Sequence, residues 1–315
     1  MQRVLLHFDA FPELAPRLAA LAGEGIAVEV IAPTEADRLA ATLPEVDVLW
    51  HVLAPVTRAM IDAAPRLRLI QKIGVGVNTI DLAAARARGI AVCNMPGTNT
   101  PAVAEMTLAL IFACLRKLAS LDRAMRRGEG FALPVVAQIA HGELHGRTVG
   151  FVGFGAVPQY LAPVLAALGA RVRFWNRRPK VSPWARQVPW EILLAESDIL
   201  SLHLPLVPET ERLLDAAALA RLKPGAVLVN TARGGLVDEE ALIAALRSRQ
   251  IAAAGLDVFA LEPPAPHHPL FALDNVVLTP HVAWLTPETW DRSLAVAVEN
   301  CRRLAAGAPL LHRIV

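Results

Sequence analysis

The stretch Thr148-Val-Gly-Phe-Val-Gly-Phe-Gly-Ala-Val-Pro158 decides the fold of this chain. An apolar run ends in a turn through Gly153 and Gly155, and a helical pattern of apolar residues then continues to Gly169. A second short apolar segment follows at 172–175. Strand, glycine turn, helix and strand open a dinucleotide-binding unit, in which the helix N-terminus attracts the pyrophosphate. The residues expected to contact this ligand around the turn are Gly153, Phe154, Gly155, Ala156 and Val157.

Pro158 stands where the dinucleotide-binding pattern has its third glycine. Proline is tolerated in the first turn of a helix because its missing N–H has no partner there. The third glycine serves close packing of helix on strand, so we expect a slightly displaced helix and a retained site. Taken alone, the turn could equally be an ordinary connection between a strand and a helix.

Composition narrows the class of protein. The 315 residues suffice for two domains, and 54% of them are hydrophobic. A formal net charge of +2 argues against a nucleic-acid surface. No apolar run is long enough to span a membrane, and the first residues do not form a signal-peptide pattern. With three scattered cysteines in apolar surroundings, we expect a cytoplasmic protein with reduced, buried thiols.

Short apolar runs alternate with helical stretches through most of the chain, which predicts parallel sheets covered on both faces. Helices are expected at 12–21 and 81–88, as one long helix from 102 to about 127, and at 287–306, with 128–147 irregular and a last strand at 310–315. The other expected strands are 4–8, 26–31, 46–50, 67–70, 90–93, 149–152, 172–175, 199–204, 226–230, 253–256 and 276–279. The fold class is therefore α/β, with six strands suiting a doubly wound sheet in the second part.

Three polar residues follow expected strands, and ligands gather at the carboxyl ends of such strands. Arg233 can hold a carboxylate through two parallel hydrogen bonds. His281 can donate a proton near neutral pH, and a carboxylate such as Glu262 can orient its ring. Each has a simpler interpretation, as a surface charge, a satisfied cap or a loop acid. Together, behind a nucleotide-binding fold, they favour catalysis.

Motifs along nearly the whole chain resemble those of the D-isomer-specific 2-hydroxyacid dehydrogenases, and within them the glyoxylate/hydroxypyruvate reductases. The motifs are Lys72-Ile-Gly-Val-Gly-Val-Asn-Thr-Ile-Asp81, Asn99 with Val103-Ala-Glu105, the glycine turn, His203-Leu-Pro-Leu206 with Thr210, Val229-Asn-Thr-Ala-Arg-Gly-Gly235, Gly255-Leu-Asp-Val-Phe259 with Glu262-Pro263, and Thr279-Pro-His281. The resemblance implies hydride transfer from NAD(P)H to a small 2-keto acid, giving the D-2-hydroxy acid. It also implies a Rossmann cofactor domain, 99–284, inserted in a flavodoxin-like substrate domain, 1–98 and 285–315.

The same resemblance implies roles for single residues. Arg233 would bind and polarise the substrate, and His281 would be the acid/base paired with Glu262. The backbone N–H groups of Val75 and Gly76 would hold the substrate carboxylate, although that second glycine turn could also be a plain turn. The remaining cofactor contacts implied are Leu204, Pro205, Thr210, Thr231, Ala232, Arg233, Asp257 and His281, of which Asp257 and the Thr231 carbonyl would orient the nicotinamide carboxamide. The long helix from 102 and the segment after it resemble the family's homodimer contact.

The end of the second strand departs from the usual pattern. An acid about twenty residues past the glycine turn accepts hydrogen bonds from the adenosine ribose and selects NAD(H). Here Asn176 replaces it, and Arg177 and Arg178 follow. We expect these three residues to contact the cofactor and to favour NADP(H), with NAD(H) as the alternative.

Several alternatives stay open on the sequence alone. Trp284 resembles a substrate-site residue of the hydroxypyruvate reductases but could be a core aromatic. His267-His268 could suggest a metal, yet the pair matches the family's loop pattern, so we expect no metal site. A cofactor-sensing co-regulator on the same fold is a second functional class, and a related dehydrogenase acting on formate or a non-carbon acid is a third.

Overall fold

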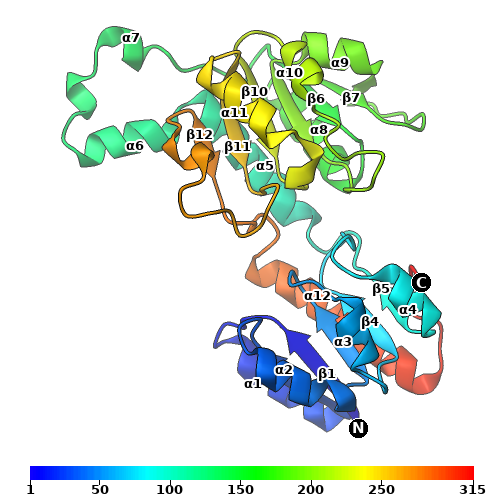
Figure 1. The fold of residues 1–315 in the computed structure, drawn as a ribbon. Helices are drawn as coiled ribbons and strands as arrows, with labels where there is room; N and C mark the ends of the chain where they lie inside the picture. The colour runs from blue at the N-terminus through cyan, green and yellow to red at the C-terminus, as the bar shows by residue number, and fades with distance from the viewer. The chain divides into compact units, whose positions relative to one another are not determined.

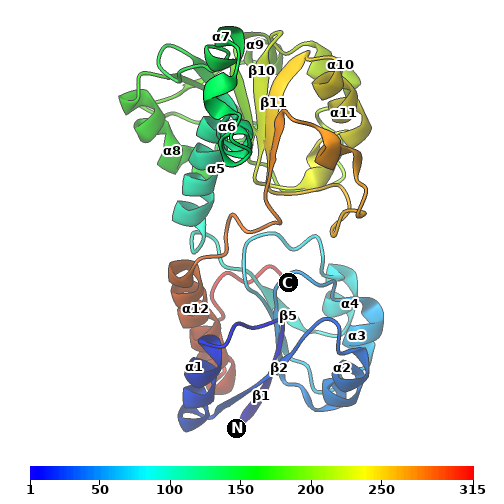
Figure 2. The same ribbon diagram turned by 90° about the vertical axis from the view of Figure 1, so that its left-hand side faces the viewer.

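The computed structural model describes residues 1–315 and divides into two compact units. The first contains Met1–Asn99 and Thr286–Val315, and the second contains Thr100–Leu285. Each unit is built on one parallel sheet with helices on both faces (Figures 1 and 2). The predicted α/β class, with one doubly wound unit inserted in another, is confirmed. None of the helices is both long enough and apolar enough to cross a membrane.

The first unit has a five-stranded sheet in the order β2-β1-β3-β4-β5, the flavodoxin-like order. Its strands are β1 (Gln2–His7), β2 (Ile26–Ile31), β3 (Val48–His51), β4 (Leu69–Lys72) and β5 (Ala91–Cys93). Its helical segments are α1 (Leu14–Ala20), η1 (Leu21–Glu24), α2 (Ala36–Thr42), η2 (Leu43–Glu45), α3 (Arg58–Asp62), α4 (Leu82–Ala87) and α12 (Pro287–Ala306). Strands β3 and β4 are buried along their whole length, as the continuous apolar runs predicted.

Local capping explains where several of these helices begin. The side chain of Thr57 accepts a hydrogen bond from the Met60 N–H at the start of α3. At the start of α4, the side chain of Asp81 accepts one from the Ala84 N–H. Helix α12 begins after Thr286, which caps it, and spans the predicted residues 287–306. In Figure 2, α1 and α12 lie on one side of this sheet and α2, α3 and α4 on the other.

The second unit has a seven-stranded sheet in the order β12-β11-β10-β9-β6-β7-β8. Its strands are β6 (Thr148–Val152), β7 (Arg171–Trp175), β8 (Arg186–Gln187), β9 (Ile199–Leu202), β10 (Ala226–Asn230), β11 (Ile251–Leu256) and β12 (Val276–Leu278). The six predicted strands are all present, and the two-residue β8 is an additional edge strand that no sequence signal indicated. The order reverses beside β6, and such a reversal forms the ligand crevice of a doubly wound sheet.

Apolar side chains bury both faces of this second sheet. One core joins α5 (Thr100–Leu115) and α8 (Ala156–Ala167) to the strands, and it includes the stacked rings of Phe154 and Phe174, 3.8 Å apart. The other core joins α9 (Trp190–Glu196), α10 (Ala216–Ala220) and α11 (Glu239–Arg247) to the opposite face. Two short 3₁₀ helices, η4 (Gly234–Leu236) and η5 (Pro269–Ala272), lie in the connections that follow β10 and β11.

The prediction of one continuous helix from 102 to about 127 is wrong, because the structure has two helices in this stretch. Helix α5 ends at Leu115, Lys117 adopts a left-handed conformation with φ of 51°, and α6 (Leu118–Arg126) follows. A left-handed residue commonly ends a helix, but glycine usually occupies that position, so lysine gave no warning. The expected irregular stretch after it contains η3 (Gly130–Ala132) and α7 (Val135–Gln138). Figure 1 shows α6 and α7 projecting from the sheet of the second unit.

The last strand expected at 310–315 is also absent as a regular element. The tail instead runs along β5 and forms a single antiparallel bridge between Cys93 and Arg313. His312 has φ of 52°, a left-handed conformation that interrupts an extended strand. The N–H of Ile314 still donates to the carbonyl of Val92, so the tail covers the edge of the sheet.

Candidate active site

The predicted site residues of the second unit gather at one edge of its sheet. All its strands are parallel, so their carboxyl ends meet there. The glycine turn follows β6, Asn176 follows β7, Leu204 and Pro205 follow β9, Thr231, Ala232 and Arg233 follow β10, Asp257 follows β11 and His281 follows β12. The topology thus brings the nucleotide-binding and catalytic candidates of this unit to the same edge.

The glycine turn is shaped to leave room for a ligand. Gly153 has φ of 90°, and a Cβ there would lie 2.7 Å from the carbonyl oxygen of His203, so only glycine fits. Gly155 is the N-cap of α8, and a Cβ there would meet no protein atom within 4 Å. The N–H groups of Gly155, Ala156 and Val157 donate no hydrogen bond within the chain. Free N–H groups facing open space at a helix N-terminus fit the pyrophosphate of a dinucleotide.

Pro158 is compatible with this arrangement. It is the third residue of α8 and is buried. Its missing N–H would have had no partner inside the helix. Phe154 differs from its neighbours in the turn, because its N–H already donates to Oδ1 of Asn176 at 3.3 Å. The donors left for a pyrophosphate are therefore those of residues 155–157.

The residues after β7 are tied to the glycine turn. Besides accepting from Phe154, Asn176 donates from Nδ2 to the carbonyl oxygen of Arg178 at 2.8 Å, so it orders the loop that carries the exposed Arg177 and Arg178. Lys180 also reaches the turn, and its Nζ donates to the Phe154 carbonyl at 2.8 Å. The sequence gives no sign of this role for Lys180, because no local pattern shows that the chain returns to the glycine turn after residue 178.

The loops after β9 and β10 use their hydroxyl groups internally. The Thr210 hydroxyl donates to the Pro205 carbonyl at 2.7 Å and accepts from the Val207 N–H at 3.0 Å, which shapes the 205–210 loop. The Thr231 hydroxyl lies 2.9 Å from the hydroxyl of Thr107. The structure therefore brings Thr210 and Thr231 to the predicted edge, with their side chains already bonded within the protein.

Arg233 is presented by a turn that a buried asparagine holds. The side chain of Asn230 accepts from the Ala232 N–H at 3.0 Å and donates to the Arg233 carbonyl at 2.9 Å. Burial lowers the pKa of the Arg233 guanidinium, while the nearby charge of Glu262 acts in the opposite direction. Arginine stays protonated despite such a shift, so Arg233 is a partly buried cation beside an acid.

Gly234 brings this turn against the loop that carries Glu262. A Cβ at Gly234 would lie 1.9 Å from the backbone carbon of Phe259 and 2.4 Å from the nitrogen of Ala260. No side chain can be accommodated without moving one of the two backbones. The Arg233 turn and the Glu262 loop are therefore in direct backbone contact.

Glu262 and His281 form the pair that the sequence predicted. Oε2 of Glu262 lies 2.6 Å from Nδ1 of His281, and its Oε1 accepts from the Phe259 N–H at 3.0 Å. Burial of the Glu262 carboxyl acts to raise its pKa, but the hydrogen bond and charge of His281, the Phe259 N–H and the charge of Arg233 together outweigh burial, and the pKa lies below its usual value. Because Nδ1 faces the carboxylate, Nε2 is the ring nitrogen left for a substrate.

Asp257 holds the loop that presents His281. Its carboxylate accepts from the Thr279 hydroxyl at 2.5 Å and from the N–H groups of Val282 and Ala283 at 3.0 and 2.9 Å. Burial raises the pKa of Asp257, and these hydrogen bonds oppose that effect. His281 itself has φ of 56°, so the loop is fixed in a conformation that non-glycine residues rarely adopt. The structure thus adds a loop-positioning role to a residue predicted only as a carboxamide contact.

The first unit carries the other predicted substrate contacts. The N–H groups of Val75 and Gly76 donate no hydrogen bond within the chain, and the side chain of Asn94 holds the Val75 carbonyl at 2.9 Å. Nearby in this unit, Nε2 of His51 lies 2.9 Å from the Thr79 hydroxyl, and burial, with the charges of Lys72 and His7, lowers the pKa of His51 to about 2. The free N–H groups form a turn that can accept a small anion.

The other candidates of the sequence have ordinary environments. Trp284 is buried three residues beyond His281. The cysteines Cys93, Cys114 and Cys301 are free and buried, and burial raises the pKa of each thiol, to about 11 for Cys93 and about 12 for the other two. Such thiols are poor nucleophiles. No group of three or more potential metal ligands gathers in the chain, and His268 contacts Glu239.

Comparison with known proteins defines the family. The model of the D-isomer specific 2-hydroxyacid dehydrogenase, NAD binding domain, matches residues 108–283, more than half of the chain. The chain belongs to the D-isomer specific 2-hydroxyacid dehydrogenase family. Within the family, it is 39% identical over 321 residues to the glyoxylate reductase of Aeropyrum pernix, covering 97% of this chain and 93% of that protein.

The chain is also similar to a relative named for another substrate and to several solved structures. The chain is 40% identical over 302 residues to D-3-phosphoglycerate dehydrogenase of Mycobacterium bovis, but it spans only about half of that protein, 56%, with 94% of this chain covered. Among solved structures, the TT0316 protein of Thermus thermophilus has a TM-score of 0.90 and 38% identity, covering 100% of both chains. An NADPH-dependent glyoxylate/hydroxypyruvate reductase of Sinorhizobium meliloti, in complex with NADP and malonate, has a TM-score of 0.84 and 29% identity, covering 100% of this chain and 97% of that one.

Proposed function

We propose that this member of the family reduces a small 2-keto acid of the glyoxylate/hydroxypyruvate type, giving the D-2-hydroxy acid at the expense of NADPH. The observation that carries this proposal is the Glu262–His281 pair beside Arg233, at the sheet edge where the glycine turn leaves room for a dinucleotide. In this proposal the first unit is the substrate domain and the second is the cofactor domain. The full-length glyoxylate reductase relative supports the substrate class.

The chemistry divides between the cofactor and the side chains of the chain. The reduced nicotinamide, when bound, supplies the hydride to the keto carbon. His281 donates the proton to the carbonyl oxygen from Nε2, because Glu262 engages Nδ1 at 2.6 Å. Glu262 also stabilises the charged imidazole ring and fixes its orientation. The proton and the hydride together convert the ketone to an alcohol.

Arg233 has a separate task in the proposed reaction. Its guanidinium can bind a carboxylate oxygen and the keto oxygen through parallel hydrogen bonds. Because it is partly buried, each such contact is stronger than it would be in water. The free N–H groups of Val75 and Gly76 would hold the substrate carboxylate. Trp284, which is buried three residues beyond His281, would contact the substrate.

We also propose that NADPH is preferred over NADH. The support is local to the loop after β7, where Asn176 replaces the acid that would repel a 2′-phosphate. Asn176 orders the backbone of Arg178, and the exposed Arg177 and Arg178 lie on that loop with Lys180 bonded to the glycine turn. Three cations around this loop suit a phosphate dianion, whereas they offer nothing specific to a ribose hydroxyl.

A homodimer is proposed from the projecting segment α6–α7. Its large apolar side chains are exposed in a single chain, and Phe131 has 92% of its surface accessible. The others are Leu118, Met125, Val135, Val136 and Ile139. Exposed apolar clusters of this kind mark protein–protein contacts, and a second copy of the chain is the proposed partner. Sedimentation of the purified protein tests this directly, with a monomer at micromolar concentration as the contradicting result.

The function is tested with a panel of 2-keto acids and both nicotinamide cofactors. We expect NADPH oxidation with glyoxylate and hydroxypyruvate, and slower oxidation of NADH. Tight cofactor binding with no turnover of any keto acid would contradict the proposed reductase and would support a cofactor-sensing protein instead.

A further inference from the structure

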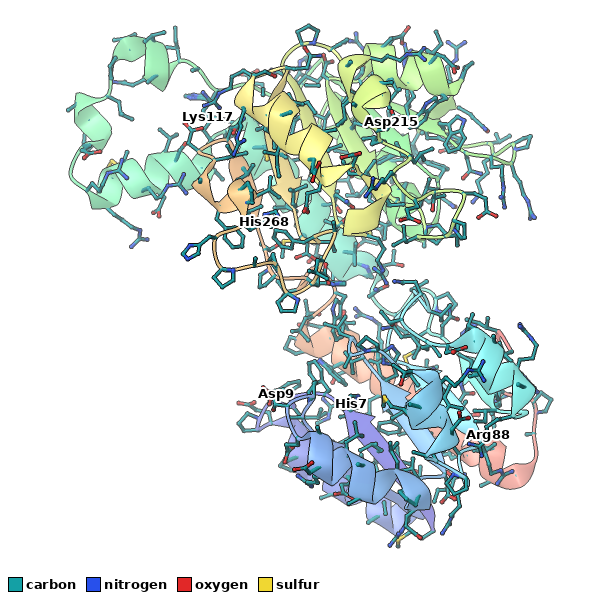
Figure 3. All side chains as sticks on the ribbon, viewed as in Figure 1. His7, Asp9, Arg88, Lys117, Asp215 and His268 are labelled. Atoms are coloured by element: carbon teal, nitrogen blue, oxygen red, sulfur yellow. The ribbon has the colours of Figure 1, made fainter.

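A second acid–imidazole pair lies beside the Glu262 loop and is not used by the proposed mechanism. Nε2 of His268 is 3.0 Å from Oε1 of Glu239, and the two side chains are only 14% and 21% exposed. Glu239 is the first residue of α11, and His268 caps η5 on the loop between β11 and β12 (Figure 3). The pair therefore joins a helix to the loop that carries Glu262.

Both carboxylate oxygens of Glu239 contact this loop, and their two partners lie at opposite ends of it. Oε2 accepts from the Ala260 N–H at 3.1 Å, two residues before Glu262, while Oε1 contacts His268, six residues after it. Nδ1 of His268 accepts from the Leu270 N–H at 3.4 Å, which leaves the ring proton on Nε2, facing Glu239. One carboxylate thus ties the start of the loop to its end.

The loop has almost no backbone hydrogen bonds of its own. Between residues 258 and 267, the only N–H groups that donate a hydrogen bond are those of Phe259 and Ala260. Phe259 donates to Glu262 and Ala260 donates to Glu239. Glutamate side chains therefore replace the backbone ladder that would otherwise fix this segment.

Ring packing and steric contact limit the loop from its other sides. The rings of Phe259, His268 and Phe271 contact one another with centroids 5.7–6.2 Å apart. The backbone of residues 259–260 abuts Gly234 with no room for a Cβ. A loop held this tightly on three sides places the Glu262 carboxylate at a fixed point relative to His281 and Arg233, the charged groups that face it.

We propose that Glu239 and His268 are positioning residues for the reaction, acting through the loop backbone on the Glu262–His281 pair. The inference rests on the proposed reductase function and adds two residues that touch neither the reacting atoms nor the cofactor in that mechanism. Its physical basis is that a small displacement of a catalytic group costs far more in rate than in stability.

The chain offers matched controls for both residues. Glu239→Gln is compared with Glu240→Gln, the exposed neighbour on the same helix, because an amide cannot accept from both Ala260 and His268. His268→Asn is compared with His267→Asn. Asparagine at position 268 retains a cap for η5 but is too short to reach Glu239. If Glu239→Gln fails to fold, the comparison of His268→Asn with His267→Asn still tests the proposal.

The expected result separates position from stability. For Glu239→Gln, kcat with glyoxylate should fall by about tenfold or more, in line with the cost of a misplaced catalytic group. The midpoint of its kcat–pH profile should move relative to the parent, while KM for NADPH stays within about twofold, since no cofactor contact is changed. His268→Asn should shift in the same direction, and both controls should match the parent.

Three outcomes that would contradict the inference can be told apart. An active parent whose Glu239→Gln and His268→Asn variants keep its kcat and pH profile would overturn the positioning role alone. A parent that reduces no 2-keto acid would overturn the reductase function and the positioning role with it. Variants with a lowered melting temperature but the kinetics of the parent would show that Glu239 and His268 only stabilise the fold, which would also overturn the inference.

Discussion

Replacing Gly234 by alanine tests how closely the Arg233 turn and the Glu262 loop must approach. The new Cβ would lie 1.9 Å from the backbone carbon of Phe259, against an ordinary contact distance of 3.4 Å. One backbone must therefore move by roughly 1.5 Å, and overpacking of this kind typically costs about 1–3 kcal/mol of stability. The atoms in the way belong to the backbone, so no side-chain rotation can relieve the contact.

The consequence for activity follows from the hydrogen bonds of Glu262. Its Oε1 accepts from Phe259, the residue that must move, and its Oε2 contacts His281 at 2.6 Å. A shift of this size at a catalytic group is expected to lower kcat by about a hundredfold.

The neighbouring glycine provides the control for this experiment. The three atoms nearest to a Cβ at Gly235 all belong to the side chain of Leu206, the closest at 3.0 Å, and a leucine side chain can rotate away. Steady-state kinetics with glyoxylate and NADPH, with melting temperatures of both variants, are the measurements. A folded Gly234→Ala protein with the kcat of the parent, or a Gly235→Ala protein equally impaired, would refute the reasoning.

Three further predictions concern the charged residues of the site. Arg233→Lys should lower kcat/KM for the keto acid at saturating cofactor by at least about tenfold, because an ammonium cannot reproduce the planar guanidinium fork; unchanged kinetics would assign Arg233 to the surface. Replacing both Arg177 and Arg178 by alanine should abolish the preference for NADPH mainly through its KM, since each charge-assisted contact is worth about 1.5–3 kcal/mol; a parent that works better with NADH contradicts this. The lowered pKa of Glu262 means that its contribution to stability is present above the unfolded-state pKa, about 4.3, and is lost as pH falls through the folded-state value. The melting temperatures of the parent and Glu262→Gln should therefore converge on acidification, and a gap that widens at low pH would show that the sign is wrong.

Features that depend on chain order could be predicted from the sequence. The glycine turn, the strand ends and the residues that follow them could be assigned because a parallel sheet sends every carboxyl end to one edge. Glu262 and His281 are nineteen residues apart, yet they meet because they follow adjacent strands β11 and β12. Their 2.6 Å contact confirms the pairing, while their catalytic roles stay a prediction.

Features that depend on tertiary contact could not be predicted in this way. Glu239 looks like an ordinary helix-start acid, and only the fold shows that it reaches Ala260 and His268. Lys180 returns to the glycine turn through a loop with no local signature. The break at Lys117 uses a left-handed lysine where sequence rules expect glycine. Asn176 was expected to face the cofactor, but its amide also orders the loop around it.

The most direct test of the proposed reaction is the turnover of His281→Ala with glyoxylate and NADPH, measured beside the parent at saturating substrates. The Glu262–His281 geometry predicts that the parent oxidises NADPH and that kcat of the variant falls by about 10²–10⁴-fold, the range of general acid–base catalysis. A folded variant whose kcat stays within a few-fold of an active parent would contradict the assignment of His281 as the proton donor.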